Sequence, residues 1–185
     1  MDDKKFNLLD EPWICVIKEN GEVKELSLMD VLLHAHQYRR LAGELPTQDV
    51  AVLRLLLAVL QTVVYRYDTD GNEDELVETE DAYERWKEIW NDGKLPDKPI
   101  QEYLTKWKAR FYLYDSDRPF YQVPKAAIGT ECKAAKLNGE ISESSNKLRL
   151  FSNRAGKEKE FLSNSEAARW LLYLNGYDDT SAKPK

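Results

Sequence analysis

The sequence predicts a mixed α+β fold: a helix-rich globular domain with small antiparallel β elements and a long flexible basic loop. Three observations predict it: two short β-rich runs near the N-terminus, several apolar runs at helical spacing, and over 30 residues without periodicity towards the C-terminus. The chain has 185 residues, of which 42% are hydrophobic and 32% charged, a globular composition. We assign residues 1–177 to a globular domain and residues 178–185 to a linker.

The first β-rich runs predict an N-terminal hairpin. Trp13–Ile17 and Val23–Leu26 flank the dipeptide Asn20-Gly21, which readily adopts the positive φ angles of a tight turn. Ser27 follows as the predicted cap of a helix, because a carboxylate stands three residues later in the capping-box position. We expect this helix to end near Arg40.

The strongest helical pattern begins at Pro46 and stops near Tyr67, with Thr47 as the predicted cap. Its apolar residues recur at helical spacing and predict the buried face, which consists of Val50, Leu53, Leu56, Leu57, Leu60 and Val64. Apolar residues also occupy flanking positions. We therefore expect this helix to be central to the domain.

Two further helices and an aromatic segment are predicted next. The first helix covers Ala82–Trp90, and its tryptophans at i and i+4 favour a place in the core. The second starts at Pro99 and continues to about Ala109. Residues 111–122 predict two extended aromatic pieces separated by a turn, since Pro119 excludes a regular helix.

Eight carboxylates lie between Asp68 and Asp81, and the first of them resemble a calcium-binding loop. The pattern fails in detail, because its glycine is misplaced at Gly71 and the closing glutamate position holds Thr79. A solvated acidic linker is the preferred interpretation.

Composition argues against several classes of function. Cys15 and Cys132 lie far apart, and His34 and His36 point to different sides of the predicted helix, so we expect no metal and no cofactor. No glycine-rich phosphate loop occurs, and no apolar run approaches the roughly 18 residues that cross a bilayer. The chain is expected to be cytoplasmic, without a membrane partner and without enzymatic activity. Its net charge of −6 argues against a free-standing DNA-binding protein.

One segment reverses this acidic charge. Between Lys133 and Lys159 seven basic residues outnumber three acidic ones. Phe151 and Asn153 stand among these charges, so the segment combines cations for phosphates with a ring and an amide that suit bases. Ser163 then caps a last helix, with Glu166 in the capping-box position. A solvated basic loop is the commoner explanation for such a segment taken alone.

Several of these pieces, in the same order, resemble one family. The opening Phe6–Ile14 is similar to the start of CasA, the large subunit of the type I-E CRISPR Cascade complex. The hairpin, the leucine-rich helix Asp49–Arg66, the aromatic segment 111–122 and the capped helix with Ser165–Leu172 fit the same pattern. The resemblance covers essentially the whole chain.

The resemblance implies a subunit without catalytic activity. Its partners would be target double-stranded DNA, the crRNA and other Cascade subunits, and the separate CRISPR helicase-nuclease. In such complexes guide pairing reads the target while protein reads a short protospacer-adjacent motif. The family's subunit is longer, so this chain would be its N-terminal portion, with further motif-reading elements beyond Lys185.

The family's flexible motif-recognition loop would correspond to about residues 146–157. Phe151 and Asn153 would then lie near the bases. The phosphate contacts would come from Lys147, Arg149, Arg154, Lys157 and Lys159. A second family element, a small glycine-bearing loop, corresponds to Leu162–Ser165, where Ser163 and Asn164 could donate hydrogen bonds although glycine is missing.

Two alternatives remain open at this point. The chain could be a purely structural scaffold that docks on neighbouring Cascade subunits and the crRNA 5′ end. It could also be an enzyme domain that uses the acidic stretch between Asp68 and Asp81.

Overall fold

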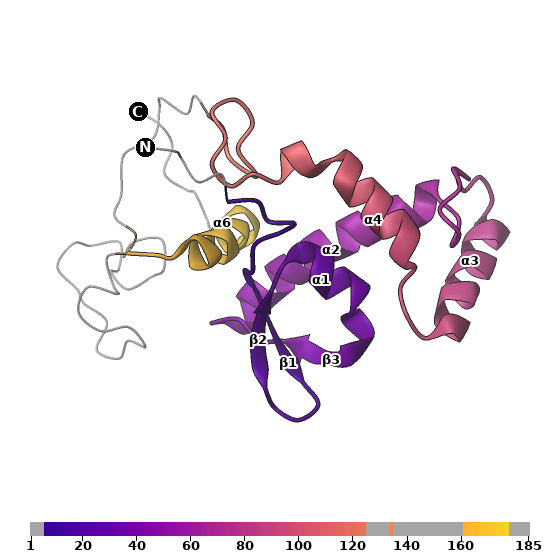
Figure 1. The fold of residues 1–185 in the computed structure, drawn as a ribbon, viewed down its shortest axis with the longest axis horizontal. Coiled ribbons are helices and arrows are strands. Elements are labelled where there is room, and N and C mark those ends of the chain that lie inside the picture. Colours follow the sequence, from indigo (N-terminus) through magenta and orange to yellow (C-terminus); the bar gives the residue numbers. More distant parts are fainter. Residues whose placement is uncertain (1–5, 125–133, 135–160, 178–185) are drawn as a thin grey trace.

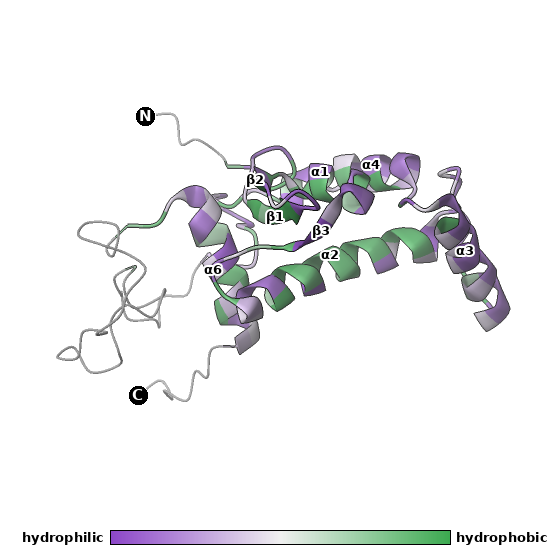
Figure 2. Cartoon of the chain, turned by 90° about the horizontal axis from the view of Figure 1, so that it is seen from below, coloured by the Kyte–Doolittle hydropathy of each residue, from purple (hydrophilic) through white to green (hydrophobic). Residues whose placement is uncertain are grey.

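The computed structural model describes residues 6–124, 134 and 161–177, and it confirms the mixed α+β, helix-rich class. A long helix, α2 (Pro46–Arg66), runs along the molecule. The small sheet and the helices α1 (Leu28–Leu33) and α4 (Asp97–Lys106) lie on one side of α2, while α6 (Asn164–Tyr177) and α3 (Thr79–Asp92) lie near its two ends (Figures 1 and 2).

The predicted hairpin is confirmed. Strands β1 (Ile14–Lys18) and β2 (Val23–Leu26) pair antiparallel, with Ile17 opposite Val23. The turn differs from the two-residue type that Asn20-Gly21 favours, because Gly21 alone adopts a positive φ, of 84°. Its N–H donates to the Lys18 carbonyl over 3.0 Å, so the loop is a three-residue turn that ends on a left-handed glycine.

A third strand replaces the expected end of the first helix. Ser27 caps α1 as predicted, and its Oγ accepts from the Asp30 N–H over 3.1 Å. The helix ends at Leu33, and the prediction that it reaches Arg40 was wrong. A 3₁₀ turn (Ala35–Gln37) leads instead into β3 (Tyr38–Leu41), which pairs with β1 and completes a sheet of order β2-β1-β3.

The central helix was predicted correctly in place but not in detail. Leu45 occupies the N-cap and Pro46 the first turn, so Thr47 is not the cap. The buried face of α2 includes Val52, Leu56 and Leu60. Three residues of the predicted face are exposed by more than two-fifths: Val50, Leu53 and Leu57. The sequence is apolar around most of the helix, so its periodicity alone did not select the buried side.

Apolar content also gives α2 the length and composition of a membrane-crossing helix, although no apolar run of that length was predicted. Among the described helices it alone has them. Half of that stretch is buried inside the fold, where α2 packs against α4 and α6, and this is the environment of a core helix.

The opening segment of the chain is a structural core element. Leu8 and Trp13 are fully buried, and the Trp13 indole N–H donates to the Leu8 carbonyl over 2.9 Å. Asn7 accepts from the Leu9 N–H and donates to the Lys108 carbonyl, which ties the segment to the turn after α4. The residues that carry the family resemblance at this end therefore serve packing.

The helix α3 begins at Thr79 and ends at Asp92, and Gly93 follows as its C-cap with a φ of 67°, the left-handed conformation typical of that position. Arg85 and Ile89 form its buried face. The expectation that Trp86 and Trp90 belong to the core was wrong, because these side chains are 42% and 84% exposed.

Candidate nucleic-acid interface

Most of the predicted DNA contacts lie outside the described residues. These are the loop residues Lys147, Arg149, Phe151, Asn153, Arg154, Lys157 and Lys159. The prediction that this basic loop is flexible also falls on residues outside the described ranges. Ser163 and Asn164 are described, and they lie at the head of α6.

The capping box at the head of α6 is formed as predicted. The Ser163 Oγ accepts from the Glu166 N–H over 3.2 Å, and a Glu166 carboxylate oxygen accepts from the Ser163 N–H over 2.7 Å. The Ser163 groups are therefore engaged in the cap. Within the described part of the chain, the backbone N–H groups of Asn164 and Ser165 donate no hydrogen bond, so they can donate to an external acceptor.

The aromatic segment 111–124 is attached to α6 at two places. The Tyr114 hydroxyl donates to the Asn164 Oδ1 over 3.0 Å, and the Asn175 amide donates to the Tyr121 carbonyl over 3.5 Å. The segment before the predicted loop and the helix after it consequently lie together on one side of the fold. Burial raises the pKa of Tyr114, so its hydroxyl stays protonated and can keep donating.

Exposed apolar side chains lie in the segments that flank residues 125–160. Val123 and Phe161, which stand at the two edges of the segment 125–160, are exposed by 73% and 67%. Tyr121 is also half-exposed, and at φ 54° it is the one residue other than glycine with a left-handed backbone among those described. Strained, exposed residues are concentrated at functional sites. Sequence reasoning did not single out Tyr114, Tyr121 or Phe161.

A buried arginine fixes the other side of α6. Arg169 donates through Nη1 to the Trp13 carbonyl and to the Glu25 carboxylate, each over 2.6 Å, and it is only 5% exposed. One residue further on, the Trp170 indole donates to Glu44 over 3.1 Å. These bonds hold the first turns of α6 against the sheet, so the head of the helix has a defined orientation.

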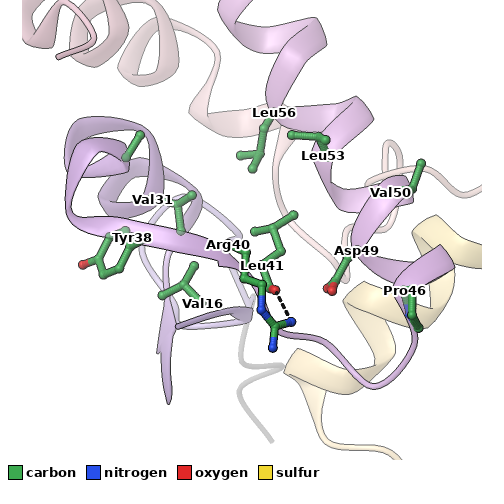
Figure 3. A pocket seen from close by; sticks show the side chains of 11 residues that line it. Val16, Val31, Tyr38, Arg40, Leu41, Pro46, Asp49, Val50, Leu53 and Leu56 are labelled. Carbon is green, nitrogen blue, oxygen red and sulfur yellow. Dashed lines mark hydrogen bonds between the residues drawn. The ribbon is translucent and has the colours of Figure 1, made fainter. Parts of the chain in front are cut away.

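An apolar groove of about 430 Å³ lies between β3, α1 and α2 (Figure 3). Of its lining residues only Arg40 and Asp49 carry charge. Arg40 donates to the Leu41 carbonyl, and Asp49 accepts from the Gly43 N–H. The groove therefore presents an apolar surface and lacks a paired acid and base.

Among the described residues, the catalytic and metal-binding candidates from the sequence are not brought together. Burial raises the pKa of the Cys15 thiol to about 11, so it is protonated at neutral pH and a poor nucleophile. Within the described ranges no three His, Cys, Asp or Glu side chains are placed to hold a metal ion. Asp68 instead closes a turn, accepting from the backbone and side chain of Asn72, and this lowers its pKa.

Comparison with known proteins shows which family this chain is similar to. The model of the family described as CRISPR-associated protein Cse1 matches residues 7–184. CasA/Cse1 of Thermus thermophilus is 33% identical over 169 residues, covering 91% of this chain and 31% of the relative.

Solved structures agree. Cse1 of Thermobifida fusca is similar with a TM-score of 0.72 and 34% identity, over 94% of this chain and 30% of the other. A chain of a CRISPR RNA-guided surveillance complex, in a pre-nicking state, shares the fold with a TM-score of 0.71 at 21% identity, over 93% of this chain and 34% of that one. The chain thus spans about a third of the length of these relatives.

Proposed function

The chain belongs to the CRISPR-associated protein Cse1 family, and we propose that it acts within a crRNA-guided surveillance complex as the N-terminal portion of the large subunit. Its role there is to contribute to target double-stranded DNA binding and to recognition of the protospacer-adjacent motif. It also contributes to recruitment of the helicase-nuclease. The proposal includes no catalytic activity for this chain.

The observation that carries the proposal is the family match over nearly the whole chain. Similarity of fold to a chain of a surveillance complex supports a place in such an assembly. Since the matched region is about a third of the relatives' length, the proposal concerns the share of the function that resides in this region.

The local geometry supports the position of the DNA interface. Tyr114 and Asn164 bring the two flanks of the basic segment to one side of the fold, next to the open N–H groups at the head of α6. An anion gains from the helix dipole at this place, and the Asn164 Nδ2, which takes no bond within the described residues, can donate to a groove acceptor. Exposed Phe161 adds a ring that can stack or wedge.

The assignment as a non-catalytic subunit has chemical support. The Cys15 thiol is protonated, and the apolar groove offers no acid and base pair. Asp74, a member of the acidic stretch, is held in an ion pair with Arg85. The remaining alternative is the scaffold that only docks on neighbouring subunits and the crRNA.

Charge reversal separates recognition from scaffolding. We expect Arg149→Glu with Lys157→Glu to leave the complex assembled and to weaken duplex binding, with the slope of log K against log salt falling by about 0.9 for each lost phosphate contact. Lys98→Glu with Lys106→Glu, which reverses two exposed charges on α4, is the matched control and should bind as the native chain. Failure of the loop variant to assemble would favour the scaffold instead.

A further inference from the structure

The helix α3 presents an aromatic surface that the proposed DNA interface does not use. Tyr83, Trp86 and Trp90 occupy positions i, i+3 and i+7, so they form one stripe along the helix. Their exposed fractions are 66%, 42% and 84%. Large aromatic side chains gathered on one exposed face are a typical mark of an interaction site.

The stripe is held in a fixed orientation. Arg85, which is only 8% exposed, donates to the carbonyls of Val64 and Asp74 over 2.8 and 2.9 Å and pairs with the Asp74 carboxylate. Ile89 is buried one turn further along the same face. Because these bonds attach α3 to the C-terminal end of α2, the aromatic stripe is part of a defined surface.

The charge around the stripe decides which partner it suits. Residues 68–92 hold eleven carboxylates and two cations, a formal net charge of −9 in a chain whose total is −6. Such a field repels nucleic acid and anionic lipid surfaces, and it opposes the approach of a second copy of the same surface. It attracts a protein surface rich in lysine and arginine.

The aromatic rings add a specific reason for cations. The ammonium of Lys87 lies 5.9 Å from the centre of the Tyr83 ring, so one ring of the stripe already carries a cation of the chain itself. Trp90, more exposed than any other tryptophan of the described residues, offers the ring type that binds cations best.

We infer that the α3 stripe of Tyr83, Trp86 and Trp90 is a docking surface for a cationic protein segment whose lysine or arginine side chains stack on the rings. The surface lies at the far end of α2 from α6 (Figure 1). A 21-residue helix is about 32 Å long, so a partner on α3 and DNA at the head of α6 can be bound together. The inference does not depend on the proposed DNA contacts.

The test measures anisotropy of a labelled helical peptide that carries leucine on one face and arginine on the other. The matched probe has glutamate at every arginine position. We expect the native chain to bind the arginine peptide at least tenfold more tightly than the glutamate peptide, with affinity falling as salt rises.

Trp86→Ser with Trp90→Ser should weaken binding of the arginine peptide tenfold or more. Glu84→Lys with Glu88→Lys should do the same and reduce the salt dependence. Val23→Ser, an exposed apolar site on β2, should change the affinity less than twofold. The altered side chains of the serine variant are exposed, so its circular dichroism should match that of the native chain.

Three results would overturn the inference. The first is equal binding of both peptides by the native chain. The second is unchanged affinity of the double serine variant. The third is a dimer in sedimentation equilibrium that the serine variant loses, which would assign the stripe to a second copy of the chain.

Discussion

Replacing Arg169 with methionine tests how α6 is held against the sheet. The arginine makes two bonds through Nη1, one to the fully buried Trp13 carbonyl and one to the Glu25 carboxylate. Methionine keeps the aliphatic volume and removes both bonds. We expect the variant to fold and to be less stable.

The magnitude follows from the environment of each partner. A hydrogen bond from a charged donor contributes about 1.5–3 kcal/mol, and the Trp13 bond counts fully because water cannot replace it. The Glu25 side chain is 38% exposed, so that pair contributes less than about 1 kcal/mol. The Nε of Arg169 is buried without a partner in the described part of the chain, and its removal returns about 1 kcal/mol. The expected net loss is about 2 kcal/mol.

Urea denaturation followed by tryptophan fluorescence measures this loss as a change in the free energy of unfolding. Glu25→Gln is the control, because it removes the ion pair and leaves the Trp13 bond, and it should lose less than about 1 kcal/mol. A loss below about 0.5 kcal/mol for Arg169→Met would contradict a stabilising role for this bond, since the buried carbonyl would then have found another donor.

Three further outcomes are expected. Gly43→Ala should lower the free energy of unfolding by about 1–3 kcal/mol, because the new Cβ would lie 2.7 Å from the Asp49 Oδ1; an unchanged denaturation midpoint would contradict this. Ser163→Ala should cost about 1 kcal/mol through loss of the cap, measured in the same assay, whereas Ser163→Thr should be close to neutral. In a Cys132→Ser background, Cys15 should react slowly with iodoacetamide at pH 8–10 and rapidly in urea, because its pKa is raised from 9.0 to about 11 in the folded chain; equal rates would contradict the raised pKa.

The sequence predicted those elements that local rules determine. The hairpin depends on a turn signal, and the caps at Ser27 and Ser163 depend on side chains within three residues of each other. These features need no information from distant parts of the chain. Each of them is found where it was expected.

Two of the errors arose where distant contacts decide the structure. Tyr38–Leu41 becomes a strand because β1 offers an edge to pair with, and the helical pattern before it cannot reveal that edge. Arg85 takes the buried side of α3 because two backbone carbonyls and Asp74 surround it, and this turns Trp86 and Trp90 outward. Propensity alone favours the opposite arrangement.

The candidate site was predictable only in part. The capped head of α6 with Ser163 could be inferred from spacing. The bond from Tyr114 to Asn164 joins residues fifty positions apart, and no sequence rule connects them. The basic segment was identified by its charge, and its role comes from resemblance to the family.

Motif recognition by the basic segment is tested most directly by duplex binding to the assembled complex. The native chain and a variant with Phe151→Ala and Asn153→Ala are compared across duplexes that differ in the protospacer-adjacent motif. We expect the variant to lose affinity for the preferred motif and to bind the other duplexes as before. A loss equal for all sequences, or no loss, would contradict base recognition by these two residues.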